Sequence, residues 1–262
     1  MSADELRGSP TEPATCVQTI VRCVALFVAG YTINGTLHEW THALTARALG
    51  VPATIFHFYA NIDEVHATDI QLALIAVTGP LFSLALGTAF WLAFKRGTAV
   101  RRPLFFYLAT FGINIFLGNL ASISFVGDFS RAARLLGVPV LARHAITGCA
   151  LLSLAVFMFW VGRELRDGVP SPANSLGTAL CLVVLPTLIG TALVIVIYLP
   201  MPPRFISATA GSSAVWLFTA IGVFARRTPS QPPARAATVW LELVVAALAA
   251  LAVRALIPGV QL

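Results

Sequence analysis

Long apolar runs dominate the sequence and constrain its fold more than any other feature. A helix needs about 20 apolar residues to cross the hydrocarbon core of a bilayer. The chain contains seven such runs, which cover residues 17–46, 71–94, 103–126, 143–162, 176–199, 205–225 and 238–257. The connections between them are short and carry charges and prolines. We therefore predict an all-α, polytopic integral membrane protein with about seven transmembrane helices.

The composition excludes several classes of soluble protein. Charged residues make up 11% of the chain and hydrophobic residues 58%, whereas soluble domains carry about 25% charged residues. So few charges could not cover a surface that faces water, which argues against a cytosolic enzyme, a disordered protein or a nucleic-acid-binding module. We expect a multi-pass protein of a bacterial cell membrane, in contact with the lipid bilayer and with no nucleic-acid partner.

The chain divides into three parts by composition. Residues 1–15 form a polar tail that lacks the basic start and short apolar stretch of a signal peptide. We predict a core of three spans over residues 16–140 and accessory helices, about four spans, over residues 141–262. The accessory runs carry few polar groups and are interpreted as a wall that shields the core from lipid. Glu242, inside the last run, either pairs with an arginine or marks a gate.

The four cysteines are interpreted as structural thiols rather than as a disulfide framework. Cys16, Cys23, Cys149 and Cys181 are too few and too scattered along the chain for such a framework. Three of them fall inside apolar runs, where a cysteine is typically a small buried side chain.

The first apolar run ends in an H-E-x-x-H motif, from His38 to His42. Residues four apart lie on one face of a helix, so both imidazoles can point at one spot and share a metal ion. Glu39 lies beside that spot, where it can take a proton from water. Ionisable groups in an apolar helix are expensive and usually functional. The alternative is two interfacial histidines with an unrelated glutamate.

A third ligand must come from another helix, because a catalytic zinc ion usually has three protein ligands. The first and third spans run in the same direction across the membrane, so a ligand near the end of the third span can meet the end of the first. Asp128 lies at that place and is the only acidic residue between Asp69 and Glu164. We predict Asp128 as the third ligand; the alternative is a helix-end aspartate paired with Arg131.

The connection over residues 50–70 has a character of its own. Thr54 to Tyr59 is rich in β-branched and aromatic residues, which indicates a short strand or hairpin at the membrane face. An interfacial loop with aromatic anchors is the other interpretation. A strand here could pair with an unwound substrate by edge addition. His57 and His66 are alternative ligands or substrate contacts, disfavoured because both lie outside the helical pair.

Three motifs together resemble those of the site-2 protease family of intramembrane zinc metalloproteases. They are HEWTHALTARALG at residues 38–50, TGP at residues 78–80 and NLASISFVGDFSRAARLLGVP at residues 119–139. The resemblance implies that His38, His42 and Asp128 bind one zinc ion per chain and that Glu39 is the general base. It also implies a membrane-protein substrate, cleaved at peptide bonds in or near a transmembrane segment.

The sequence leaves some functional questions open. In such chemistry a second group usually donates a hydrogen bond to the developing oxyanion. Asn114 and Asn119 are candidates for this donor, although either side chain could instead form an interhelical hydrogen bond. Ser83 stands where the family often has asparagine, and Phe129 follows Asp128 where glycine is usual.

The alternative function is a non-proteolytic membrane protein, either a degenerate homologue that binds metal or a scaffold. Loop charges place the N-terminus in the cytoplasm, whereas the resemblance implies the opposite orientation.

Overall fold

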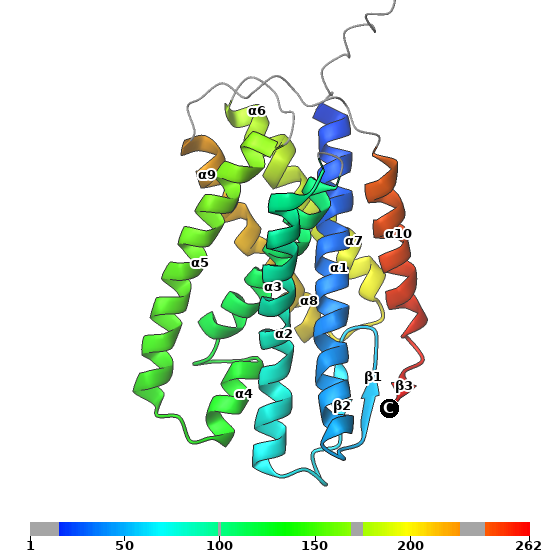
Figure 1. Cartoon of the computed structure of the whole chain (residues 1–262), viewed down its shortest axis with the longest axis vertical. Coiled ribbons are helices and arrows are strands. Elements are labelled where there is room, and N and C mark those ends of the chain that lie inside the picture. The colour runs from blue at the N-terminus through cyan, green and yellow to red at the C-terminus, as the bar shows by residue number, and fades with distance from the viewer. Residues whose placement is uncertain (1–15, 99–100, 169–174, 226–238) are drawn as a thin grey trace, which may run out of the picture.

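The computed structural model describes residues 16–98, 101–168, 175–225 and 239–262; the predicted tail, residues 1–15, lies outside them. The described chain is mainly helical (Figure 1). Six helices are long and apolar enough to cross a membrane, in agreement with an all-α polytopic membrane protein. Four are continuous: α1 (Cys16–Ala48), α2 (Asp69–Arg96), α3 (Arg102–Ala121) and α5 (Val140–Gly168). Two are built from shorter pieces, which are α6 (Ser175–Ala179), η1 (Leu180–Val184) and α7 (Leu185–Tyr198), then α8 (Pro203–Ala214), η2 (Val215–Phe218) and α9 (Thr219–Ala225).

Two of the predicted runs differ from the observed helices. The run at 238–257 corresponds to α10 (Trp240–Ala255), which has only 16 described residues, so a seventh span stays a prediction. The predicted end of the run at 103–126 was wrong, because α3 ends at Ala121 and turns follow it. A short helix, α4 (Asp128–Leu135), then precedes α5. Apolar residues in the turns, such as Phe125 and Val126, had extended the predicted span.

Helix α1 is the central element of the bundle. It packs against α2, α3, α7 and α10 (Figure 1). The Asn34 side chain donates hydrogen bonds to the backbone oxygens of Gly30 and Leu108, and so joins α1 to α3. Around Phe27 of α1, aromatic rings from α3 and η2 form edge-to-face pairs, with centroids 5.0 Å away for Phe111 and 5.6 Å for Trp216. Aromatic packing of this kind holds the half of the bundle farther from the H-E-x-x-H motif.

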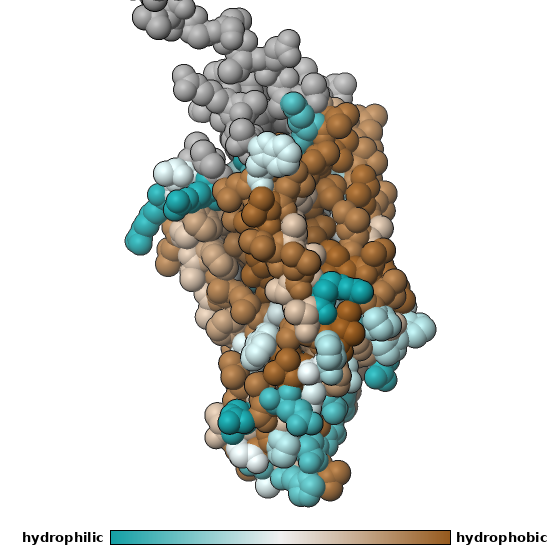
Figure 2. Space-filling model, turned by 90° about the vertical axis from the view of Figure 1, so that its right-hand side faces the viewer, coloured by the Kyte–Doolittle hydropathy of each residue, from teal (hydrophilic) through white to brown (hydrophobic). Residues whose placement is uncertain are grey.

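The outside of the bundle is apolar. Large hydrophobic side chains are exposed along its helices, for example Leu152 of α5 at 68% and Leu251 of α10 at 65%. Figure 2 shows an apolar surface over much of the molecule's length, with hydrophilic residues gathered near its lower end. Such a surface would be costly in water and suits contact with lipid chains.

A small sheet lies at the lower end of α1. The strands are β1 (Ala53–Ile55), β2 (Ala60–Ile62) and β3 (Val260–Gln261), in the order β2-β1-β3 and all antiparallel. The predicted hairpin is therefore present, although the segment 54–59 contains the end of β1 and the turn rather than one strand. Strand β3 was not predicted, because two paired residues leave no periodic pattern in the sequence.

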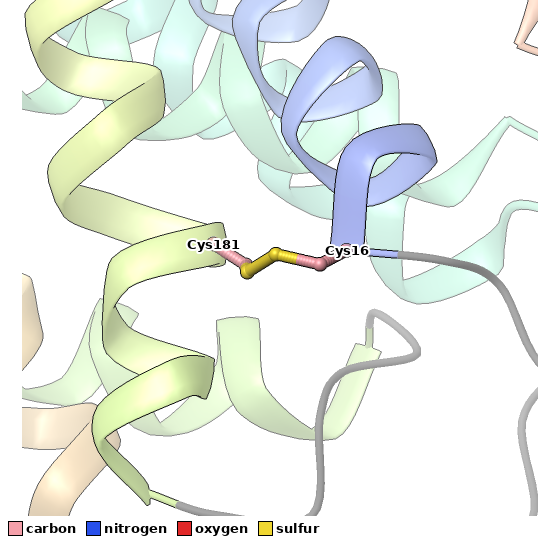
Figure 3. The surroundings of a disulfide bond; sticks show 2 residues. All are labelled: Cys16 and Cys181. Atoms are coloured by element: carbon pink, nitrogen blue, oxygen red, sulfur yellow. A yellow bond between two sulfur atoms is a disulfide. The ribbon is translucent and has the colours of Figure 1, made fainter.

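The cysteine interpretation was wrong for one pair. Cys16, at the first residue of α1, forms a disulfide with Cys181 of η1 (Figure 3). The two are 165 positions apart, so their proximity depends on helix packing that spacing alone cannot reveal. Cys23 is a buried free thiol, as expected, whereas the free thiol of Cys149 is exposed on the surface of α5.

Glu242 pairs with an arginine, which was one of its two predicted roles. The Arg22 Nε donates to Glu242 Oε1 at 2.8 Å, and Arg22 Nη2 lies 2.7 Å from the same oxygen. The Glu242 side chain is 2% exposed and that of Arg22 is 12% exposed. Each charge therefore offsets the energetic cost of burying the other. The pair joins α10 to α1.

We expect Glu242→Ala to lower the free energy of unfolding by about 3–5 kcal/mol, because it leaves the Arg22 charge buried without a partner. Denaturant unfolding in detergent measures this change. The double variant Arg22→Met with Glu242→Leu is the control, since replacing both charges with apolar groups is often neutral. Equal stability of Glu242→Ala and wild type would contradict a stabilising role for the pair.

Candidate metal centre

Three side chains from two distant parts of the chain meet at one point. The Nε2 atoms of His38 and His42 are 3.1 Å apart. Asp128 Oδ2 lies 3.0 Å from His38 Nε2 and 3.5 Å from His42 Nε2. Both histidines are buried. These are the residues that the sequence predicted as a ligand set.

Hydrogen bonds to the other ring nitrogens fix which histidine nitrogens face this point. His42 Nδ1 lies 2.7 Å from the backbone oxygen of Ile75, which can only accept, so Nδ1 carries the proton. Ser83 Oγ donates to the Gly79 oxygen at 3.0 Å and therefore accepts from His38 Nδ1 at 3.1 Å. A neutral imidazole that carries its proton on Nδ1 keeps a lone pair on Nε2, the state needed in a metal ligand.

The spacing of the three donor atoms fits a zinc ion. Ligand atoms about 2.0–2.1 Å from a tetrahedral zinc ion lie about 3.3 Å from one another, and the three observed separations are 3.0, 3.1 and 3.5 Å. Without a cation or a proton between them, two nitrogen lone pairs and a carboxylate oxygen would face one another at these distances. Within the described residues the cluster offers three side chains that could bind a metal ion. Three protein ligands are typical of catalytic zinc sites, whereas structural sites have four.

Gly79 of α2 makes room for the histidine pair. A Cβ atom built at this position would overlap the His42 imidazole and lie 2.9 Å from His38 Cε1. Any larger residue would push α2 away from α1 or turn the rings. The glycine of the TGP motif therefore has a steric function, and the Ile75 and Ser83 contacts come from the same helix.

The turn before α4 positions Asp128. Gly127 has a φ of 98°, a conformation that L side chains rarely adopt, and it directs the chain into the helix. The Asn119 Oδ1 accepts the Asp128 backbone N–H at 3.2 Å, while its Nδ2 donates to the Ile115 oxygen at 3.1 Å. Asp128 is thus the first residue of α4, not the end of the third span as predicted. Its expected alternative partner, Arg131, instead pairs with Glu64 at 2.9 Å.

Glu39 lies next to the donor atoms on α1 but is not one of them. Its Oε2 accepts a hydrogen bond from the Ala60 backbone N–H of β2 at 2.8 Å. This contact holds the carboxylate between the metal-ligand cluster and the sheet. The sequence predicted the proximity of Glu39 to the histidines but contained no signal for its bond to β2.

A cavity of about 760 Å³ connects these groups. His38, Glu39, His42 and Asp128 line it, together with residues from β2, α2, α3, α5 and α8. Asn114 also lines it, is buried, and has no partner for its Oδ1 among the described residues. Of the two oxyanion candidates, Asn119 uses both polar side-chain atoms to hold the start of α4, so Asn114 is the candidate that is left.

The two other histidines near the hairpin are engaged elsewhere. His57 Nε2 lies 2.9 Å from the Tyr198 oxygen and 3.1 Å from the Pro200 oxygen, so it links the hairpin turn to the end of α7. His66 Nδ1 lies 2.8 Å from Asp63 Oδ2, and this hydrogen bond lowers the pKa of the exposed Asp63 carboxyl. Neither belongs to the cluster of potential metal ligands.

No protein-family model, curated protein or solved structure matches this chain. The motifs and the arrangement of the residues around the cavity are therefore what point to a function.

Replacing Gly79 with alanine should prevent zinc from binding at this candidate site, because the added methyl group occupies the space of the His42 ring. Metal content of the purified protein, measured by mass spectrometry, tests this. Gly148→Ala in α5 is the matched control, because a Cβ there meets nothing within 4 Å. Equal zinc in both variants would contradict the steric role of Gly79.

Ser83→Ala should weaken zinc binding by about 10- to 100-fold, the usual effect of losing a hydrogen-bond partner of a ligating histidine. Competition with a fluorescent zinc chelator measures the change. Ser153→Ala is a suitable comparison, because the Ser153 hydroxyl bonds only to the Cys149 oxygen within α5. An unchanged zinc affinity in Ser83→Ala would show that the Ser83 contact does not orient His38.

Proposed function

We propose that this protein is an intramembrane zinc metalloprotease that hydrolyses peptide bonds in or near transmembrane segments of membrane proteins. The observation that carries the proposal is the meeting of His38, His42 and Asp128, with Glu39 beside them, at the wall of one cavity inside an apolar helical bundle. Each feature alone has a structural explanation. Together they supply a ligand set, a base and room for a peptide.

The charges of the proposed site balance. Two neutral imidazoles, the Asp128 carboxylate and the Glu39 carboxylate together carry two negative charges, which one Zn²⁺ ion would neutralise. Neutrality is important here because an uncompensated charge is expensive among apolar helices.

The residues divide the chemistry between them. A zinc ion held by His38, His42 and Asp128 would lower the pKa of a water molecule and polarise the scissile carbonyl. Glu39 takes the proton from the attacking water and later delivers it to the leaving amine. Asn114, which lines the cavity, would donate from Nδ2 to the oxygen that develops negative charge.

The peptide must be extended where it is cleaved. A helical peptide bond is shielded by its own hydrogen bonds, so the substrate has to unwind near the site. Ala60 and Ile62 of β2 line the same cavity as the ligand set. An unwound segment can therefore replace its lost helical hydrogen bonds by pairing with β2.

Glu39→Gln should reduce cleavage by about 10²- to 10⁴-fold while zinc content stays at the wild-type level, because the amide cannot act as a base. The assay uses protein reconstituted into liposomes with a transmembrane substrate, identified by comparing membrane-protein fragments in cells with wild-type and variant enzyme. Undiminished cleavage would exclude Glu39 as the base. Stoichiometric zinc with no cleavage of any substrate would favour the non-proteolytic alternative.

A further inference from the structure

The hydrogen-bond pattern of the hairpin shows which backbone groups of β2 are turned away from β1. In an antiparallel pair, residues that exchange hydrogen bonds alternate with residues that do not. The Phe56 N–H donates to the Tyr59 oxygen at 2.9 Å, and the Asp63 N–H donates to the Pro52 oxygen at 3.0 Å. Bonded positions therefore recur at every second residue from Tyr59 to Asp63. Ala60 lies between two of these positions, so its backbone groups do not bond to β1.

Ile62 lies two residues after Ala60, so its backbone N–H and C=O groups also point away from β1. The register pairs Ala53 with Ile62, and Ala53 uses its own oxygen on the other side, where it accepts from the Leu262 N–H at 3.0 Å. The backbone N–H and C=O groups of Ala60 and Ile62 therefore form the outer edge of the sheet. That edge borders the cavity with the ligand set.

One donor of this edge is already in use. The Ala60 N–H is bonded to Oε2 of Glu39, the residue that the proposed reaction needs as its base. An extended peptide that adds to β2 would offer a backbone carbonyl to the same N–H. Because one N–H makes one strong hydrogen bond, the peptide and the Glu39 carboxylate compete for it.

We propose that the Glu39–Ala60 hydrogen bond is a latch that holds the base until the backbone of an extended peptide docks on β2 and releases it. The inference rests on the proposed function and adds a specificity-determining group to it, the backbone N–H of Ala60. A peptide carbonyl that accepts the Ala60 N–H would leave the Glu39 carboxylate without this partner. Docking therefore both aligns the peptide and frees Glu39.

The latch defines the class of substrate by backbone conformation. A segment that stays helical keeps its carbonyl oxygens in its own hydrogen bonds and cannot displace Glu39. A segment that unwinds can do so with almost any side chains, because main-chain groups make the contact. The enzyme would thus select for unwinding near the cavity more than for sequence.

Peptide binding to the full-length protein in detergent tests the latch without catalysis. The probe is a fluorescein-labelled hexapeptide of alternating threonine and valine, measured by anisotropy with a chelator present to prevent hydrolysis. Glu39→Ala removes the competitor for the Ala60 N–H and should tighten binding by about 2- to 10-fold, the value of one ordinary hydrogen bond. Glu39→Gln is the matched control, because its amide oxygen can still accept from Ala60 and binding should stay near the wild-type value.

Ala60→Pro completes a double-mutant cycle. Proline removes the N–H at an outward-facing edge position, where it does not break the pairing with β1. In this background Glu39→Ala should no longer change the dissociation constant. If Ala60→Pro does not fold, the two Glu39 variants still decide the question.

Several results would overturn the latch. They are equal or weaker peptide binding in Glu39→Ala than in wild type, equal tightening in Glu39→Ala and Glu39→Gln, or no binding to any form. Binding of an N-methylated copy of the peptide as tight as that of the probe would also do so, because that copy cannot enter a β-ladder. None of these results bears on whether Glu39→Gln reduces cleavage, so the latch and the proposed protease activity can fail separately.

Discussion

Polar groups inside an apolar bundle need partners, and this requirement shapes the half of the molecule around the ligand cluster. In lipid, an unpaired polar group costs several kcal/mol. Three donor atoms within 3.5 Å of one another are therefore surrounded by contacts that fix each of them: the Ile75 oxygen and Ser83 for the imidazoles, and Asn119 for the start of α4. The close approach of α2 at Gly79 brings the first two partners within reach.

The same requirement explains the small sheet. Buried backbone outside helices has to find hydrogen-bond partners in a sheet, or to border a cavity where other partners can reach it. Strand β1 has β2 on one side and β3 on the other, and the free edge of β2 faces the cavity. Part of the predicted accessory region, residues 141–262, thus completes the sheet and lines the cavity through α5 and α8. Sheet and cavity both draw on chain segments beyond residue 140.

The sequence predicted features that depend on local spacing and missed those that depend on packing. Seven apolar runs were predicted as spans, and the described residues contain six helices long enough to cross a membrane. The i, i+4 spacing of His38 and His42 predicted their shared face. The proximity of Asp128 to the two histidines was predicted because it is the only acidic residue between Asp69 and Glu164. The Cys16–Cys181 disulfide, strand β3 and the Glu39–Ala60 bond could not be predicted, because each joins segments whose proximity follows only from the packed bundle.

The wide separation of the donor residues has a consequence for the maturation of the protein. His38 and Asp128 are 90 positions apart, and they meet only after α1, α2 and α4 have packed together. A newly inserted chain offers just two imidazoles, which bind zinc far less firmly than three converging donors do. A metal ion bound at the cluster, as we propose, would therefore meet its full set of donors only late in folding, once these helices have packed.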